Sequence, residues 1–156
     1  MSPTFTIMTA VDLSDYSATI VRYSVWLSKQ LNADLVLVNV INQRDLDMVQ
    51  RAMTGYEPFS YQNYLKDQVQ DRKTSLEGLI EAASPGTVKC RCLVHSGIPY
   101  RELLAAIDIE KSNLLIVGTK GRSNLADVVV GSTARKLYRR SPIPLLTIPA
   151  GFNELP

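Results

Sequence analysis

A glycine-rich segment in the last third of the chain has residue types and a spacing that suit the binding of an anion. It holds three glycines and two hydroxyl residues in the pattern G-x2-G-x9-G-S-T, at Gly118, Gly121, Gly131, Ser132 and Thr133. Glycines let a ligand approach backbone N–H groups closely, and the free N–H groups at the start of a following helix favour an anion. The pattern is neither G-x4-G-K-[ST] nor G-x-G-x-x-G. The segment therefore predicts a phosphate site of another geometry.

The charge distribution supports an anionic ligand at this segment. The whole chain has a net charge of only +2, which is too small to imply nucleic-acid binding, yet residues 118–149 hold six basic side chains and one acid. Arg122 lies in the loop itself. The basic residues between positions 135 and 140 belong to the following helix-like segment, where they would also interact favourably with the helix dipole. For these helix residues both interpretations stay open.

Length and composition are typical of one soluble globular domain, which we place at residues 1–156. The chain has 46% hydrophobic and 21% charged residues. Residues 1–5 lack the basic start and long apolar stretch of a signal peptide, and no apolar run approaches the length of a membrane span. We therefore expect a cytoplasmic protein with no membrane or nucleic-acid partner.

Two cysteines and the single histidine form a C-x-C-x-x-H pattern at Cys90, Cys92 and His95. These residues supply at most three metal ligands, whereas structural metal sites usually need four. The two cysteines alternate with Arg91 and would share one face of a strand. We interpret them as buried apolar side chains and expect no metal site.

Apolar runs alternate with amphipathic segments along the chain. We predict five strands, at residues 4–11, 34–41, 88–94, 113–117 and 143–148. We predict helices from about residue 16, within 42–59, at 60–83, at 99–111 and at 134–140. The stretch from Asn42 to Phe59 ends in a loop, and it could cover a cleft or form another packed turn. The alternation predicts an α/β fold with a five-stranded, open, doubly wound parallel sheet.

Such sheets bind ligands beyond the carboxyl ends of their strands, where the strand order reverses. If the first strand is central and the fourth lies beside it, the reversal falls between these two strands. Asp12 and Gly118 then face each other across a crevice.

The chain resembles the universal stress protein family over essentially its whole length. The matching segments are Ala10-Val11-Asp12-Leu13-Ser14, Asn39-Val40, Gly97-Ile98-Pro99, the glycine pattern from Gly118-Thr119-Lys120-Gly121-Arg122 to Gly131-Ser132, and the ending from Ser141 to Pro149. In this family the pattern G-x2-G-x9-G-[ST] marks the ATP-binding branch. The resemblance implies a Rossmann-like (adenine nucleotide alpha hydrolase-like) sheet with strand order 3-2-1-4-5, and an adenine-nucleotide site.

The resemblance also implies a role for each matching residue. Asp12 would accept a hydrogen bond from the adenine amino group, beside the backbone of Ala10 and Val11; alternatively it starts the first helix. Val40 and Val117 would flank the base and ribose, or are simply buried. The other nucleotide-binding positions are Ser14 in the turn, Gly118 and Gly121 at the ribose and phosphates, Arg122 at a phosphate, and Gly131, Ser132 and Thr133 at the helix N-terminus. Alternatively, Gly131, Ser132 and Thr133 form an ordinary helix cap. Arg122 is alternatively a solvated loop residue.

Two positions depart from the commoner family pattern. Asn39 stands where many members have histidine. Asn124 stands where a glycine is common, which weakens the expectation that residues 124–130 contact the ligand.

The implied ligand is ATP, ADP or AMP, with any Mg²⁺ held through the phosphates. Hydrolysis needs a positioned base, yet Asp127 is the only acid near the glycine loop and no Ser-His-Asp or paired-carboxylate set is visible. We expect a regulatory stress-response protein in which ATP affects conformation or partner choice, with weak hydrolysis at most. The alternatives are a slow ATPase or nucleotidyl-transferring enzyme, and a dimeric scaffold without nucleotide.

The terminal strand suggests an assembly. The run from Ile143 to Ile148 is apolar, flanked by prolines and placed at a sheet edge, so it is either guarded against pairing or paired with its own copy. The family pairs these strands across a two-fold axis. We therefore expect a homodimer.

Overall fold

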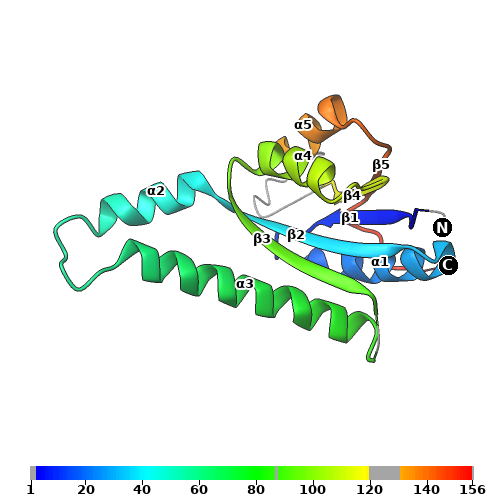
Figure 1. The fold of residues 1–156 in the computed structure, drawn as a ribbon, viewed down its shortest axis with the longest axis horizontal. Helices are drawn as coiled ribbons and strands as arrows, with labels where there is room; N and C mark the ends of the chain where they lie inside the picture. Colours follow the sequence, from blue (N-terminus) through cyan, green and yellow to red (C-terminus); the bar gives the residue numbers. More distant parts are fainter. Residues whose placement is uncertain (1–2, 87, 120–130, 156) are drawn as a thin grey trace.

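Figure 1 shows the computed structural model, which describes residues 3–86, 88–119 and 131–155. Five parallel strands form one sheet in the order β3-β2-β1-β4-β5. The strands are β1 (Thr6–Ala10), β2 (Asp34–Asn42), β3 (Cys90–Gly97), β4 (Leu114–Gly118) and β5 (Leu145–Ile148). The helices are α1 (Ser17–Leu31), α2 (Gln43–Ala52), α3 (Tyr61–Ala83), α4 (Pro99–Ile109) and α5 (Ser132–Arg140). The predicted fold class and strand order are confirmed.

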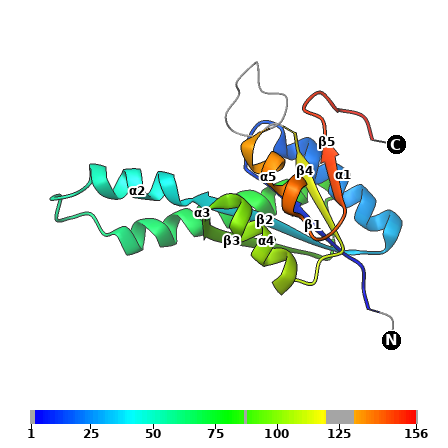
Figure 2. The ribbon, with the colours of Figure 1, turned by 90° about the horizontal axis from the view of Figure 1, so that it is seen from above.

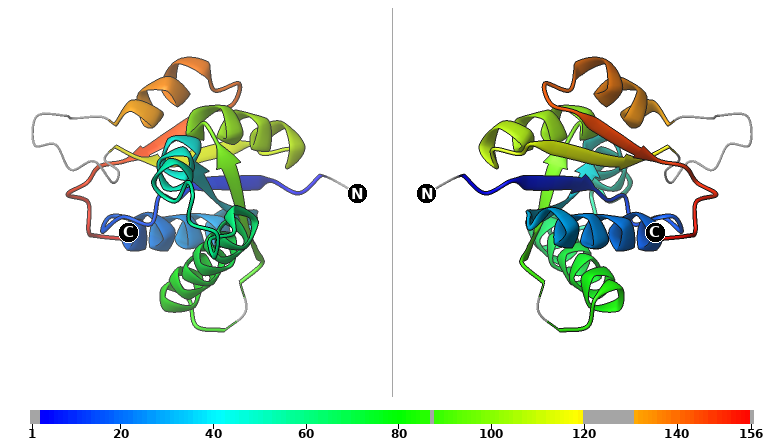
Figure 3. Two further views of the ribbon diagram at one scale, coloured as in Figure 1. Left: turned by 90° about the vertical axis from the view of Figure 1, so that its left-hand side faces the viewer. Right: turned by 90° about the vertical axis from the view of Figure 1, so that its right-hand side faces the viewer.

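Helices cover both faces of the sheet, with α1 and α3 on one side and α4 and α5 on the other (Figure 3). This arrangement explains the almost continuous apolar sequence of β2, which has no solvent-facing side. Alternate residues of β2 enter opposite cores. Val36 and Val38 pack toward α4 and α5, whereas Leu35 and Leu37 pack toward α1 and α3.

Several element boundaries differ from those predicted. β5 begins at Leu145 rather than residue 143, because Pro144 has no N–H to donate to a strand partner. β3 continues to Gly97, where it pairs with Asn42 at the end of β2. α5 begins at Ser132, two residues before its predicted start.

The stretch from Asn42 to Phe59 contains a helix that follows β2 without a loop. Asn42 caps α2 by accepting a hydrogen bond from the Arg44 N–H at 3.0 Å. α2 and the first part of α3 extend together away from the sheet as an arm (Figures 1 and 2). Only Leu46 of α2 is buried. The stretch is therefore a projecting arm whose base, and not its tip, meets the rest of the fold.

None of the helices in the described ranges is both long enough and apolar enough to cross a membrane.

Candidate functional site

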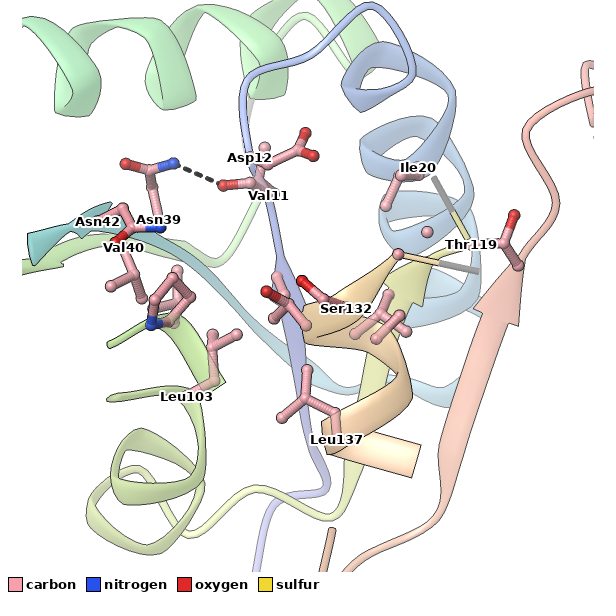
Figure 4. Close-up of a pocket in the computed structure, with 18 of the residues that line it drawn as sticks. Val11, Asp12, Ile20, Asn39, Val40, Asn42, Leu103, Thr119, Ser132 and Leu137 are labelled. Carbon is pink, nitrogen blue, oxygen red and sulfur yellow. Dashed lines mark hydrogen bonds between the residues drawn. The ribbon is translucent and has the colours of Figure 1, made fainter. Parts of the chain in front are cut away.

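A cavity of about 310 Å³ opens at the carboxyl ends of β1, β2 and β4, where the strand order reverses (Figure 4). Its floor is apolar and comes from the core on the α4 and α5 side, with Val38, Leu103, Val117, Ala134 and Leu137. Its polar lining comes from the tip of β1, the end of β2, the base of the arm and the start of α5. The cavity combines this apolar floor with polar groups at its ends, as small-molecule sites commonly do.

The tip of β1 presents a carboxylate at the cavity. Asp12 Oδ1 accepts hydrogen bonds from the Ser14 N–H at 3.0 Å and the Ser17 hydroxyl at 3.2 Å. Leu13, which lies between Asp12 and Ser14, has φ 61°, a left-handed backbone conformation that is unfavourable for a branched side chain. The two hydrogen bonds fix the turn. Within the described part of the chain Asp12 Oδ2 accepts no hydrogen bond, so it can still accept one from a ligand.

A buried amide links this tip to the arm. Asn39 is only 1% exposed, and its Nδ2 donates to the Val11 carbonyl at 2.7 Å (Figure 4). Its Oδ1 accepts from Arg72 Nη1 of α3 at 3.0 Å. Asn39 therefore holds Val11 and Arg72 in fixed positions. Both Asn39 and Arg72 line the cavity.

The end of β2 offers backbone groups to the cavity. The last hydrogen bond between β1 and β2 runs from the Val11 N–H to the Val38 carbonyl at 2.9 Å. Because backbone groups alternate in direction along a strand, the N–H and C=O of Val40 point to the same side as those of Val38. β1 has already ended there, so in the described structure no strand pairs with β2 on that side at Val40. Val40 can therefore contribute backbone donors and acceptors as well as apolar contact.

The N-terminus of α5 supplies the opposite end of the cavity. Its N-cap is Gly131, which has no side chain to bond the first N–H groups of the helix. The Gly131 N–H itself donates to the Thr119 carbonyl at 2.8 Å, and the Gly131 carbonyl accepts from the Arg135 N–H at 3.0 Å. The N–H groups of Ser132 and Thr133 are left without an intrahelical partner. This end of the cavity therefore favours an anionic group.

Most of the predicted site residues lie together at this cavity. Those that line it are Ala10, Val11, Asp12, Val40, Val117, Gly118, Gly131, Ser132 and Thr133. Ser14 does not line it; its N–H and hydroxyl instead hold the turn after β1, the hydroxyl accepting from the Tyr16 N–H at 3.3 Å. Gly121 and Arg122 lie outside the described residues.

Sequence reasoning missed the polar groups at the base of the arm. Asn42, Arg44, Asp45 and Arg72 line the cavity beside Asn39. Arg44 Nε lies 4.0 Å from Asp45 Oδ1, and both side chains are largely exposed. Arg72 carried one signal, since it precedes the buried Leu76 by four residues and so lies on the inward face of α3.

The C-x-C-x-x-H pattern does not form a three-ligand set. Cys90, Cys92 and Val94 pack against the core on the α1 and α3 side. His95 follows Val94 in the same strand, so its side chain lies on the opposite face. The described residues contain no group of three or more histidine, cysteine, aspartate or glutamate side chains able to hold a metal ion.

Comparison with known proteins shows the family. The sequence profile described as "Universal stress protein family" matches residues 4–149. Universal stress protein YxiE of Bacillus subtilis is 27% identical over 144 residues, which cover 90% of this chain and 96% of that protein. Universal stress protein MJ0577 of Methanocaldococcus jannaschii is 23% identical over 146 residues, covering 86% and 90% of the two chains.

Solved structures share the fold. The structure of MJ0577 superposes with a TM-score of 0.75 at 19% identity, covering 92% of this chain and 94% of that one. A universal stress protein in complex with cAMP superposes with a TM-score of 0.66 at 21% identity, covering 96% and 100% of the two chains. With the family profile spanning nearly the whole sequence, the chain belongs to the universal stress protein family.

Proposed function

We propose that this protein binds an adenine nucleotide, with ATP as the expected ligand, and acts in the cytoplasm as a nucleotide-dependent regulatory protein of the stress response. The observation that carries the proposal is the pairing of two polar ends across one apolar cavity. A carboxylate with an available oxygen lies at the tip of β1, and at the start of α5 lie helix N–H groups that have no partner among the described residues. A related universal stress protein has been solved in complex with cAMP, which also supports an adenine nucleotide here.

Each end suits a different part of the nucleotide. Asp12 Oδ2 would accept a hydrogen bond from the adenine amino group, and the backbone of Val40 would meet the edge of the base. The floor formed by Val117 and Leu103 would pack against the base and ribose. The phosphates would lie at Ser132 and Thr133, where the helix dipole and the two hydroxyls favour negative charge. Any Mg²⁺ would be held through the phosphates and water.

The arrangement favours a protein that holds ATP over one that turns it over rapidly. Hydrolysis requires a base or water-orienting group at the terminal phosphate. The described carboxylates at the cavity are Asp12, at the end assigned to the base, and Asp45, at the base of the arm. We therefore expect bound ATP to change conformation or partner choice, with slow release of inorganic phosphate at most.

Nucleotide binding can be tested on the purified protein. Denaturation followed by chromatography should release adenine nucleotide, and calorimetric titration of the stripped protein with ATP and Mg²⁺ should show one site per chain. A phosphate-release assay on the same sample measures turnover. The proposal fails if the stripped, folded protein binds neither ATP, ADP nor AMP at millimolar concentration.

We further propose that the protein is a homodimer that pairs through β5. β5 lies at the edge of the described sheet, and Leu145 and Leu146 are half-buried against opposite cores, so the open surface is mainly backbone. The Pro144 carbonyl accepts from the Leu115 N–H of β4 at 3.0 Å, and the Ile148 carbonyl accepts from the N–H of Thr119, the residue after β4, at 3.1 Å. Because the backbone groups of successive residues in a strand point to opposite sides, the N–H of Thr147 points away from β4, toward the unpaired edge of the described sheet.

Replacement of Thr147 by proline should convert the dimer to a monomer. Proline removes this outward N–H, and it is tolerated on an edge strand where the lost donor faced solvent. Thr147→Val keeps the N–H and serves as the control. Light scattering coupled to gel filtration should report a dimer for the wild type and for Thr147→Val. A wild-type monomer, or a Thr147→Pro variant as dimeric as the wild type, would exclude pairing through β5.

A further inference from the structure

Cys90 and Cys92 lie side by side on one face of β3, away from the nucleotide cavity. They pair in register with Leu35 and Leu37 of β2, so both side chains point toward α3. Neither is fully buried, and both are free thiols. β3 is the strand at the other edge of the described sheet. The structure thus corrects the prediction that both side chains are buried: each cysteine is partly exposed, and the two neighbouring side chains pack against the core on the α1 and α3 side.

The two thiols are coupled and unequal. A hydrogen bond with Cys92, together with burial, raises the pKa of Cys90 beyond its ordinary range, and the Cys90 thiol also donates to the Arg91 carbonyl at 3.7 Å. The hydrogen bond between the two cysteines lowers the pKa of Cys92, and Lys73 of α3 adds to this effect, whereas partial burial and Glu77 oppose it. Since the thiolate is the nucleophile, the lowered pKa of Cys92 favours it over Cys90 as the attacking sulfur.

We propose that Cys90 and Cys92 form a peroxide-reactive dithiol, in which Cys92 attacks the oxidant and Cys90 resolves the product. In the first step the Cys92 thiolate attacks one oxygen of hydrogen peroxide. The O–O bond breaks, the departing oxygen leaves as water after protonation, and Cys92 becomes a sulfenic acid. In the second step Cys90 sulfur attacks the Cys92 sulfur, and the sulfenic hydroxyl leaves with the Cys90 proton as a second water. Two thiols are oxidised and one peroxide is reduced to two waters.

The strand geometry permits the closing step with a local bend. Residues two apart in a strand have Cα atoms about 6.6 Å apart, which is near the upper end of the range that a disulfide spans. The side chains must lean together, and the backbone must bend at Arg91 between them. Because β3 has no strand on its outer side in the described sheet, this bend has no second strand pairing to disturb.

The assignment is tested by treating the full-length protein with hydrogen peroxide and measuring intact mass and free thiols. The wild type should lose both thiols and two hydrogens, reversibly with dithiothreitol, as a monomeric chain on a non-reducing gel. In Cys90→Ser, Cys92 should stop at a sulfenic acid that dimedone traps. In Cys92→Ser, the remaining thiol should react at least about tenfold more slowly, because burial still raises the pKa of Cys90.

A matched pair of variants shows whether the reactivity of Cys92 comes from the hydrogen bond with residue 90 or from the exposure of Cys92 alone. Serine at position 90 keeps a hydroxyl donor for the Cys92 sulfur, whereas Cys90→Ala removes it, so Cys92 should alkylate faster at neutral pH in Cys90→Ser than in Cys90→Ala. Circular dichroism confirms that each variant is folded. Retention of both wild-type thiols, equal reaction of Cys92→Ser and Cys90→Ser, or disulfides only between chains would overturn the proposal.

Discussion

Replacing Asp12 by asparagine should weaken ATP binding by about tenfold to a hundredfold while leaving the protein folded. The amide oxygen of Asn can still accept from Ser14 and Ser17, so the turn after β1 is retained. The second oxygen of Asp12, Oδ2, which we assign to the adenine amino group, is replaced by an NH₂ group. Two donors, the new amide and the adenine amino group, would then face each other across the base end of the cavity.

The same substitution makes a sharper prediction about the base. Inosine triphosphate carries a carbonyl where adenine has its amino group, so the amide of Asp12→Asn can donate to it. Calorimetric titration should therefore show the preference for ATP over inosine triphosphate reduced or reversed. Asp15→Asn, in the same turn but exposed, controls for the loss of a negative charge. Equal losses for both nucleotides would mean that Asp12 acts through charge or structure and does not contact the base.

The architecture followed from the sequence because its signals are local and repeated. The nearly continuous apolar run of β2 is typical of a strand covered on both faces, and its alternation with helices favours parallel strands. The site followed in part for the same reason. Gly118 ends β4 and Asp12 lies two residues beyond β1, and because these parallel strands are neighbours, the two residues lie at the same edge of the sheet.

The rest of the site depends on contacts that sequence spacing does not encode. From the sequence alone Asn39 is only a departure from the family pattern, whereas the structure shows its amide hydrogen-bonded on both sides, to Val11 and Arg72. Arg72 is 33 residues away from Asn39 along the chain, and only the packing of α3 brings it to the cavity. The projecting shape of the arm could not be predicted either, because the few apolar residues between positions 42 and 59 have a spacing that fits a helix or a packed turn equally well.

Gly131 gives the most direct test of the phosphate end, because the fold itself does not require glycine there. Its φ of −64° and ψ of 159° are accessible to any residue. Among the described residues, a Cβ built at this position would meet only the Thr119 carbonyl oxygen, at an ordinary 3.8 Å. What a side chain would obstruct is the approach of a ligand to the first N–H groups of α5.

Gly131→Ala should therefore change the free energy of unfolding by no more than about 1 kcal/mol in either direction, since alanine restricts the unfolded chain but is a poorer N-cap than glycine. ATP affinity should nevertheless fall by about tenfold, and in Gly131→Val by about a hundredfold or more, as phosphate contacts to the helix N–H groups are lost. Gly78→Ala, at an open position of α3, is the matched control for both measurements. If Gly131→Val folds and binds ATP like the wild type, the phosphates do not lie at the start of α5, because no bound phosphate could reach those N–H groups past the valine side chain unhindered.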